Sequence, residues 1–288
     1  FNDSTDTLNW YFRDSGGSAT NLTTNQEFRD VSAWYHFVFV YDSGQAVAAN
    51  RQTIYCNGAE ITSFSSSGYV AQNTDSNLNS NVSVKIGAIG TGSPSVYSSQ
   101  YLSEVVFLDG QTLAASNFGE YDEDSPTIWK PKDVSTLTFG DNGFYLDFED
   151  SANLGNDANG GTDWTEVTLA AADQAVDTPT NNFCTWNPLD NFYKAATFSQ
   201  GNCMTVGGAS SKNSWITSTI ALTKGKWYCE MVVPDVTTDH SNVSFGISDK
   251  VTASATQALG TLDAYQWAYR MSNGQKRNNN SSTAYGNT

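Results

Sequence analysis

Short runs of aromatic and β-branched residues, separated by clusters of Gly, Asn, Asp and Ser, are the feature that most limits how this chain can fold. No segment keeps the 3.6-residue apolar period of an amphipathic helix. The densest run, WYHFVFVYD at residues 34–42, is apolar on both faces, so we expect a strand that is central in a sheet or covered by loops. The pattern as a whole predicts an all-β fold.

The next run, QTIYCNGAEI at residues 52–61, predicts a hairpin, because Asn57 and Gly58 supply the positive φ angles that a two-residue turn needs. In the later run NGFYLDFED, apolar residues alternate with Tyr145, Asp147 and Glu149, as in a half-buried strand. Further strands are expected in TLNWYFRD, NVSVKIGAIG and YLSEVVFLDG. The segment DSGQAVAANRQ, which precedes the hairpin, is expected to be a surface loop.

The composition changes near residue 150, where the chain becomes rich in turn residues. Residues 151–193 are interpreted as an extended linker or strap, because their periodicity is weak. Beyond them, β-rich runs resume in NCMTVGG, SWITSTIAL, GKWYCEMVV, NVSFGIS and YQWAYRMSNG. A chain of 288 residues is long enough for two domains. We therefore predict two β-sandwich domains, at residues 1–150 and 194–288, joined by the strap.

The charge balance limits the partners. The chain has 14 basic and 30 acidic residues, for a formal net charge of −16. Such a chain repels a phosphate backbone and an anionic membrane surface, so neither nucleic acid nor a membrane is an expected partner. No apolar run approaches the roughly 20 residues of a membrane span. Carboxylates suit hard cations such as calcium, although solubility is the simpler role of the charge.

The four cysteines lie beside aromatic or apolar residues, and none forms a CxxC pair, which argues against a structural zinc site. We expect buried free thiols that pack as small hydrophobic side chains. A disulfide stays open as an alternative. The chain begins at Phe1 and its ends are abrupt, which indicates a fragment of a longer polypeptide.

The first 150 residues resemble a laminin G-like, concanavalin A-like jelly roll. The resemblance rests on AWYHFVFVYDS, RQTIYCNGAEI and YLSEVVFLDGQTL, in that order. It implies that the first strand of the N-terminal sandwich is missing from this chain. It also implies a fold shared by lectins, in which calcium is common, and by glucanases.

Longer strings resemble predicted structural proteins of marine tailed bacteriophages, namely FLDGQTLAASNFGEYDEDSPTIWKPK, FGDNGFYLDF and DTPTNNFCTWNPL. In the second half, GKWYCEMVV and SFGIS resemble a SPRY-type β-sandwich, a protein- or ligand-binding module that would be incomplete here. Together these resemblances imply a virion protein, such as a tail fibre, tail spike or capsid decoration. Its partners would be host-surface glycans or other virion proteins, and it would be a homo-oligomer, since fibres and spikes are often symmetric trimers.

Catalytic constellations are scarce. His36 is expected to be a core or sheet-face histidine, and His240 an exposed loop residue, since no serine or cysteine nucleophile has a supporting context. A glycosidase needs two carboxylates that flank the scissile bond. The Glu-x-Asp-x-x-Glu pattern of the jelly-roll glucanases is absent, and the nearest pair is Asp147 and Glu149. They would share the solvated face of an ordinary strand. The expectation is a non-enzymatic protein, with a polysaccharide hydrolase as the alternative.

Two acidic segments are candidate calcium sites. GNDANGGTD places Asp157, Asn159 and Asp163 in a Gly-rich turn, where alternating oxygen side chains can wrap the ion. The simpler interpretation is turn chemistry alone. The run GEYDEDSP at residues 119–126 holds four carboxylates and is more typical of a solvated loop.

An aromatic platform is the candidate for sugar binding. The loop GTGSPSVYSSQY presents Tyr97 and Tyr101 among Ser, Gly and Gln, a composition typical of adaptable recognition surfaces. The alternative is that both tyrosines cap the hydrophobic core. The sequence thus predicts a glycan-adhesion or architectural protein of a virion, or else a secreted or cell-surface adhesin on the same fold.

Overall fold

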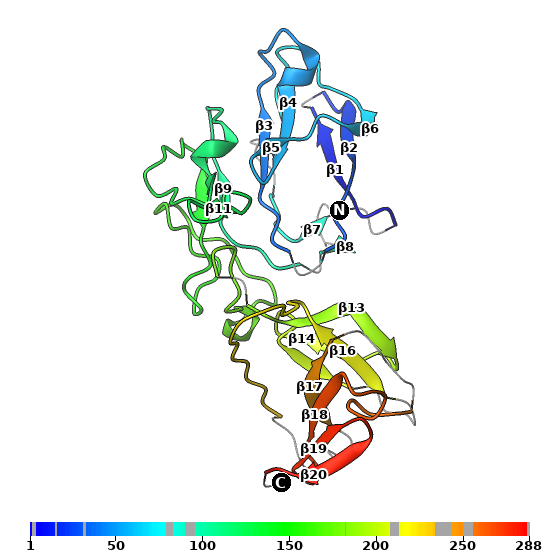
Figure 1. The fold of residues 1–288 in the computed structure, drawn as a ribbon. Helices are drawn as coiled ribbons and strands as arrows, with labels where there is room; N and C mark the ends of the chain where they lie inside the picture. The colour runs from blue at the N-terminus through cyan, green and yellow to red at the C-terminus, as the bar shows by residue number, and fades with distance from the viewer. Residues whose placement is uncertain are drawn as a thin grey trace. The chain divides into compact units, whose positions relative to one another are not determined.

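The computed structural model describes residues 1, 4–14, 16–30, 33–78, 83–89, 96–98, 100–181, 183–207, 213–233, 243–249 and 256–286. The chain divides into two compact units, residues 1–182 and 183–288 (Figure 1). The all-β prediction is confirmed, because the described residues contain strands and three short 3₁₀ turns but no α-helix. No helix among the described residues is long and apolar enough to span a membrane.

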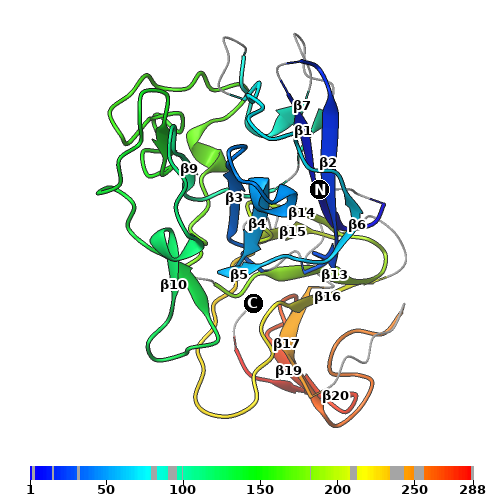
Figure 2. The ribbon, with the colours of Figure 1, turned by 90° about the horizontal axis from the view of Figure 1, so that it is seen from above.

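Two three-stranded sheets make the sandwich at the start of the first unit. One sheet has the order β1-β2-β6 and the other β3-β4-β5, and all pairings are antiparallel. Figure 2 shows the first sheet beside the second. The bounds are β1 Thr7–Arg13, β2 Ala19–Glu27, β3 Phe37–Tyr41, β4 Gln52–Cys56, β5 Ala59–Glu60 and β6 Phe64–Ser67.

The core lies between these sheets, because each presents its apolar face to the other. Leu22 and Ile54, one from each sheet, are fully buried, and Leu8, Phe28 and Ile61 complete the centre. Burying a side chain of this size stabilises the fold by about 1.5–3 kcal/mol relative to leaving it exposed. The alternation of apolar residues along the strands therefore concentrates the buried apolar side chains between the two sheets.

The aromatic run at residues 34–42 forms strand β3, which lies at the edge of its sheet among the described strands. Phe39 and Tyr41 contact Trp10 and Phe12 of β1, with ring centroids 5.4 and 4.7 Å apart. Val38, on the opposite face, is buried as well. The strand is thus not central among the described strands, and its cover is partial, because Phe39 is 46% exposed while Val38 is buried.

The predicted hairpin between β4 and β5 is confirmed. Asn57 and Gly58 have φ of 48° and 78°, and Cys56 pairs with Ala59 across them. The loop that precedes β4 contains the 3₁₀ turn η1, Ala48–Arg51, and is exposed as expected. Arg51 holds this loop, since its guanidinium donates to the carbonyls of Gln45, Ala46 and Val70.

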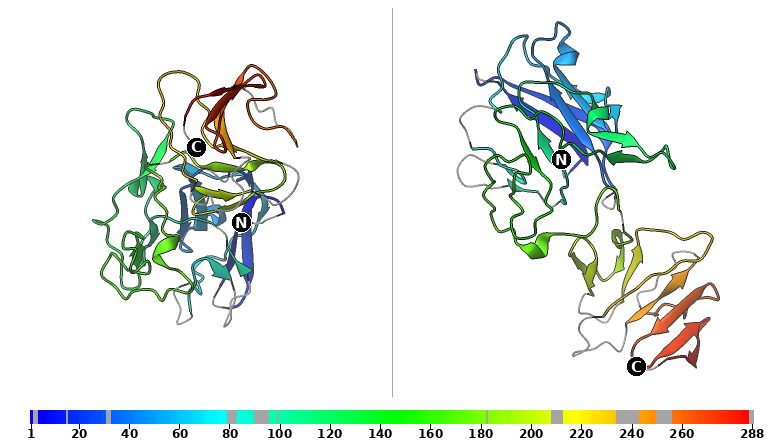
Figure 3. Two further views of the ribbon diagram at one scale, coloured as in Figure 1. Left: turned by 90° about the horizontal axis from the view of Figure 1, so that it is seen from below. Right: turned by 90° about the vertical axis from the view of Figure 1, so that its left-hand side faces the viewer.

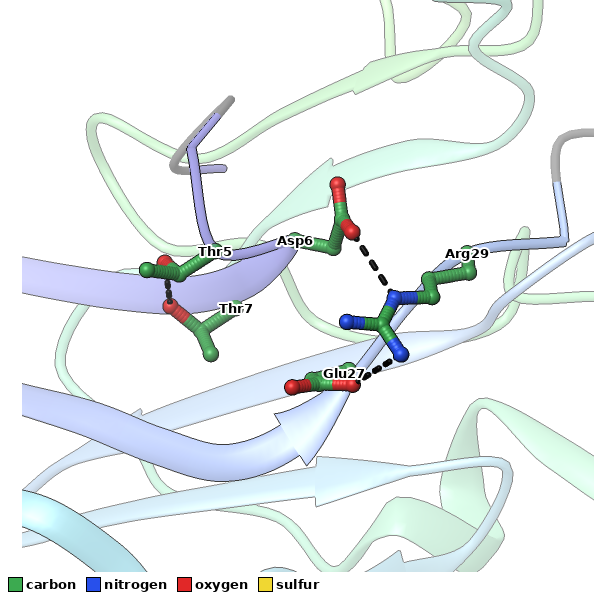
Figure 4. Close-up of polar contacts among 5 residues, drawn as sticks. All are labelled: Thr5, Asp6, Thr7, Glu27 and Arg29. Carbon is green, nitrogen blue, oxygen red and sulfur yellow. Dashed lines mark hydrogen bonds and ion pairs between the residues drawn. The ribbon is translucent and has the colours of Figure 1, made fainter.

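At the far end of the β1–β2 pair, polar contacts close the hairpin's open side (Figure 4). The guanidinium of Arg29 lies 2.9 Å from a carboxylate oxygen of Asp6 and 2.6 Å from one of Glu27. The hydroxyls of Thr5 and Thr7 lie 2.8 Å apart. The ion-paired side chains of Arg29, Asp6 and Glu27 are largely solvent-exposed, so the ion pairs orient the strand ends more than they stabilise the fold.

The rest of the first unit consists of three antiparallel pairs, β7–β8, β9–β12 and β10–β11. Phe107 and Phe144 stack across the β9–β12 pair with centroids 5.6 Å apart, and Trp164 covers Phe144. The bounds are β7 Ala88–Ile89, β8 Val96–Tyr97, β9 Val105–Phe107, β10 Gly119–Tyr121, β11 Trp129–Pro131 and β12 Phe144–Leu146, with 3₁₀ turns η2 Ala115–Asn117 and η3 Ala171–Asp173.

Two predicted strands are much shorter than the sequence pattern indicates. Of NVSVKIGAIG, the described residues form only the two-residue strand β7. The strand in NGFYLDFED ends at Leu146, because Phe148 has a φ of 60° and the amide of Glu149 turns back to the carboxylate of Asp147. A side-chain alternation predicts a face, but it supplies no partner strand.

The boundary near residue 150 and the strap over 151–193 differ from the division in the structure. Residues 151–182 belong to the first unit, where Trp34 donates to the carboxylate of Asp177 and Gln174 donates to the carbonyl of Phe148. The last part of the predicted strap, Trp186–Tyr193, is strand β13 of the second unit.

The second unit contains the pairs β13–β16 and β14–β15 and a four-stranded antiparallel sheet, β17-β18-β19-β20, drawn in orange to red in Figure 3. Its described buried hydrophobic residues are only Ala196 and Ala268. The bounds are β13 Trp186–Tyr193, β14 Thr197–Ser199, β15 Met204–Val206, β16 Ser214–Ser218, β17 Ser244–Ser248, β18 Gln266–Arg270, β19 Gln275–Asn278 and β20 Ser281–Ala284.

The strand predicted in GKWYCEMVV is wrong, since residues 225–233 carry no strand. Trp227 and Tyr228 are 63% and 84% exposed. The expectation of buried thiols holds only for Cys56, because Cys184, Cys203 and Cys229 are exposed. All four cysteines are free, so the disulfide alternative is not adopted.

Candidate functional site

The predicted aromatic platform lies on the β7–β8 ribbon and the segment that follows it. Tyr97 is 70% exposed and Tyr101 is 49% exposed, so neither is a core residue. Tyr97 lies directly opposite the small residue Ala88, which places the two side chains on one face of the ribbon. Ile89 and Val96 form the other cross-strand pair and are also exposed. The ribbon therefore presents apolar surface on both faces.

The structure brings together two of the three predicted calcium ligands. Asp157 is buried, and its Oδ1 accepts the amides of Tyr145 and Asn159, at 2.9 and 3.1 Å. The amide of Asp157 in turn donates to Oδ1 of Asp163, at 3.1 Å, and Asn153 donates to the other oxygen. These hydrogen bonds hold the pKa of the Asp163 carboxyl below its usual range. The loop is thus organised by carboxylates that accept backbone amides.

This geometry suits a turn better than a cation site. An oxygen that accepts two amides presents little lone-pair density to a metal, and calcium needs six to eight oxygen ligands. Asn159 contributes its amide to the loop, and its side chain is exposed. Within the described part of the chain, no group of three or more His, Cys, Asp or Glu side chains is arranged to hold a metal ion. Calcium binding by Asp157, Asn159 and Asp163 stays a prediction.

The acidic run at residues 120–124 lies at the turn of the β10–β11 hairpin. Asp122 accepts the amides of Asp124 and Ser125 through Oδ1, and its Oδ2 lies 3.2 Å from the ammonium of Lys130. The hydrogen bond from Lys130, followed by that from the Ser125 amide, lowers the pKa of the Asp122 carboxyl. The run therefore shapes a turn, as its simpler interpretation predicts.

A carboxyl group that the sequence did not single out, that of Glu104, has the more unusual environment. Its Oε2 accepts a short hydrogen bond from the hydroxyl of Tyr145. Burial, and then the charges of Asp147, Glu149 and Asp133, raise its pKa, while the hydrogen bond from Tyr145 opposes that shift. The φ of Glu104 is 56°, a left-handed conformation that few side chains adopt. The sequence carries no signal for Glu104, because its burial, its bond with Tyr145 and its left-handed φ are visible only in the structure.

The Asp147 and Glu149 pair does not share the solvated face of a strand. Both residues lie beyond the end of β12, in a turn that their own hydrogen bond closes. The catalytic interpretation assumed that one strand holds both carboxylates on the same face. The two residues lack that rigid placement. Their charges act on Glu104 instead.

His36 takes part in a contact between distant parts of the first unit. Its Nδ1 accepts a hydrogen bond from Nε1 of Trp129, at 2.9 Å, so a neutral ring carries its proton on Nε2. Burial lowers the pKa of His36 and favours this neutral form. The indole of Trp129 lies against Gly58 and Gly119, where an added Cβ would meet it at 2.3 and 2.4 Å. His36 thus has the structural role that the sequence predicts, whereas His240 lies outside the described residues.

The hairpin that supports this contact also borders a cavity of ≈ 360 Å³. Its lining includes Cys56, Asn57, Glu60 and Gln26. Burial raises the pKa of the Cys56 thiol to about 11, so the sulfur is a protonated, weakly reactive group. The cavity presents one carboxylate and no activated nucleophile, which gives it no evident chemistry.

Residues 1–96 match the family model described as the Concanavalin A-like lectin/glucanases superfamily, of the Laminin_G_3 type. The class of this part of the protein is therefore a concanavalin A-like, laminin G-like domain, in agreement with the sandwich of β1 to β6. No curated protein and no solved structure matches the chain.

Proposed function

We propose that this protein is a non-enzymatic structural protein of a bacteriophage particle, in a tail fibre, tail spike or capsid decoration, that adheres to host-surface glycans. The observation that carries the proposal is the exposed ribbon of β7 and β8 on a concanavalin A-like domain. The resemblance of three long strings to marine phage structural proteins supports the placement on a virion. A homo-oligomer and a SPRY-like second unit are parts of the same proposal, as are contacts with other virion proteins.

The ribbon has the physical properties that a sugar platform needs. A saccharide offers an apolar C–H face and a rim of hydroxyls, so it binds where an aromatic ring meets a few polar groups. Tyr97 supplies a ring that keeps most of its surface in solvent, beside Ala88, which leaves room over the strand. The hydroxyl and amide of the adjacent Ser98 both bond to the carbonyl of Gly87, which holds the two strand ends together.

The first test is a glycan array probed with the recombinant chain, in calcium and again in EDTA. We expect binding to a defined subset of glycans, and we expect Tyr97→Ala to abolish it. Tyr265→Ala is the matched control, because Tyr265 is 54% exposed but belongs to the second unit. Binding that survives Tyr97→Ala would remove the ribbon as the site. The absence of binding by folded protein would leave only an architectural role.

Placement on the particle has its own test. Mass spectrometry and immunogold labelling of purified virions should find the protein on an exposed structure. Its absence from the particle would contradict the virion role and favour the secreted or cell-surface adhesin.

A polysaccharide hydrolase is the second candidate, and the environment of Glu104 is the observation in its favour. A carboxyl whose pKa is raised by burial and neighbouring charges is what a general acid requires, and Asp147 supplies a nearby carboxylate. The measurement is reducing-end release from a panel of marine polysaccharides. Release that is lost in Glu104→Gln and in the double variant Asp147→Asn/Glu149→Gln would establish the enzyme. No release from any substrate would argue against it.

A further inference from the structure

Charge is divided very unequally between the two units. Residues 183–288 contain 8 of the 14 basic residues and 6 of the 30 acidic ones, a formal charge of +2. Residues 1–182 contain the other 6 and 24, a formal charge of −18. The strong negative charge of the chain therefore belongs to the first unit, and the second unit is open to anions.

A cavity of ≈ 330 Å³ lies within this second unit. Its charged lining residues are Arg270 of β18 and Arg277 of β19, and no acidic residue is among the described residues that line it. The other lining residues are uncharged, and all but Ala258 carry a hydroxyl or an amide, as Ser244, Asn213 and Asn280 do. Two guanidinium groups in a small polar cavity are a recognition element for an anion.

The sheet register places both arginines on one face. Arg270 lies opposite Ser244 of β17 on one side and Gln275 of β19 on the other. Arg277 is two residues beyond Gln275, so it is the diagonal neighbour of Arg270 on the same face. Because both positions belong to a four-stranded hydrogen-bonded ladder, the backbone fixes where the two arginine side chains begin.

A loop and a neighbouring strand form the walls of the cavity. The amide of Gly260 donates to Oε1 of the fully buried Gln266, which fixes the loop across β18. This loop packs so closely on β19 that an added Cβ at Gly260 would lie 2.8 Å from the carbonyl oxygen of Arg277. On the other side, Asn213 donates to the carbonyl of Gln257, at 2.8 Å. These contacts hold the loop of residues 257–261 against β18, β19 and Asn213.

The two arginines also act on each other. Burial, followed by the positive charge of Arg270, lowers the pKa of Arg277. The Nε of Arg277 donates to the hydroxyl of Ser282, at 3.2 Å, which orients its guanidinium. An oxyanion between the two groups would remove their repulsion and accept charge-assisted hydrogen bonds.

We propose that the cavity between Arg270 and Arg277 binds an oxyanion, the carboxylate or sulfate group of an acidic saccharide. The size of the cavity, at the small end of the range for ligand pockets, fits a ligand larger than a bare ion. The neutral hydroxyls and amides of Ser244, Thr261 and Asn280 supply partners for sugar hydroxyls. This site lies in a different unit from Tyr97, so it goes beyond the glycan platform proposed above and does not depend on it.

The experiment is an NMR titration of the ¹⁵N-labelled full chain with glucuronate, glucose and sodium sulfate in parallel. We expect glucuronate to shift the signals of Ser244, Arg270 and Arg277, and glucose to leave them unchanged. In Arg277→Gln the Kd for glucuronate should rise by about tenfold or more, because a charge-assisted hydrogen-bond pair is lost. Arg277→Lys should fall between the two, since it keeps the charge without the planar fork.

Lys276→Gln is the matched control. Lys276 is the next residue on β19 and faces the opposite side of the sheet, where its ammonium lies 5.4 Å from the ring centroid of Tyr285. The Lys276→Gln substitution removes the same charge as Arg277→Gln. The Kd for glucuronate should nevertheless change by less than about twofold, as expected for a screened surface charge. An equal loss in Lys276→Gln would reduce the effect to general electrostatics and overturn the site.

The remaining outcomes are also decisive. Binding of sulfate alone would show a site for a free inorganic anion and would refute the saccharide ligand. Equal shifts with glucose would refute recognition of the oxyanion. No shift with any of the three, from a chain whose spectrum is folded, would refute the site altogether.

Discussion

The contact between Trp129 and the hairpin turn predicts a large difference between two glycine substitutions. Gly58 and Gly17 both occupy turns of the first unit with positive φ, 78° and 88°. An added Cβ at Gly58 would lie 2.3 Å from Cζ3 of Trp129, whereas at Gly17 it would meet nothing within 4 Å. Gly17→Ala is therefore a matched control that carries the backbone strain without the collision.

The magnitudes follow from these contacts. The left-handed conformation costs either alanine variant about 1–2 kcal/mol. Overpacking against the indole adds about 1–3 kcal/mol, and the loss of the Trp129–His36 hydrogen bond about 1 kcal/mol more. We expect Gly58→Ala to lower the free energy of unfolding by about 3–6 kcal/mol, which is at least about 2 kcal/mol more than Gly17→Ala.

The assay is urea unfolding of the full chain, followed by far-ultraviolet circular dichroism and tryptophan fluorescence, because coincident transitions are needed before free energies are compared. In a Trp129→Ala background, Gly58→Ala should cost only the backbone strain, since the indole that it displaces is gone. Equal costs for Gly58→Ala and Gly17→Ala, or a cost unchanged by Trp129→Ala, would refute the packing of this indole on the turn.

Three further predictions concern pH, thiols and the acidic loop. Burial lowers the pKa of His36 in the folded protein. The stability that the neutral ring contributes is fully present above the unfolded pKa of about 6.5 and should decrease as the pH falls towards the folded pKa. The urea midpoint should therefore drop more between pH 7.5 and 5.5 in wild type than in His36→Gln, and equal drops would contradict this. Iodoacetamide should modify Cys184, Cys203 and Cys229 in the native protein but Cys56 only after unfolding, as peptide mass spectrometry would show, because Cys56 is buried and its thiol pKa is about 11. Asp157→Ala should cost about 1.5–3 kcal/mol, because two amides lose a charged acceptor, whereas Asn159→Ala, at an exposed side chain, should change stability by less than about 0.5 kcal/mol. A calcium-dependent rise of Tm in wild type that is absent in Asp157→Ala would support the calcium prediction, and similar costs for the two variants would contradict the loop's hydrogen bonding.

Sequence patterns predict best where the physics is local. The hairpin turn at Asn57 and Gly58 follows from the φ preferences of two adjacent residues, and the structure has it where the sequence places it. Strands β1, β16, β17 and β18 likewise form within the predicted runs, since alternation and β-branched residues suit a pleated surface. The exposure of Tyr97 also agrees with a composition of small polar neighbours, although the residue lies in strand β8 and not in a loop.

Predictions that need a partner strand fare less well. Residues 83–87, 147–149 and 225–233 have apolar or alternating patterns, but the described structure gives them no strand. A pattern states which side chains share a face, whereas a strand also requires a second strand to accept its backbone hydrogen bonds. Trp227 and Tyr228 lie in a segment with a strand-like pattern, but the segment has no partner strand and both side chains are exposed.

The sequence by itself determined the all-β class, the principal strands and the turn chemistry, because these depend on neighbours within a few residues. Only the tertiary structure decided that Trp129 would reach His36, that Tyr145 would share a hydrogen bond with Glu104, and that Arg270 and Arg277 would line one cavity. Such contacts join residues by sheet register and packing across 7 to 93 positions. No pattern of neighbouring residues encodes these contacts, since they form only when the strands have paired into sheets.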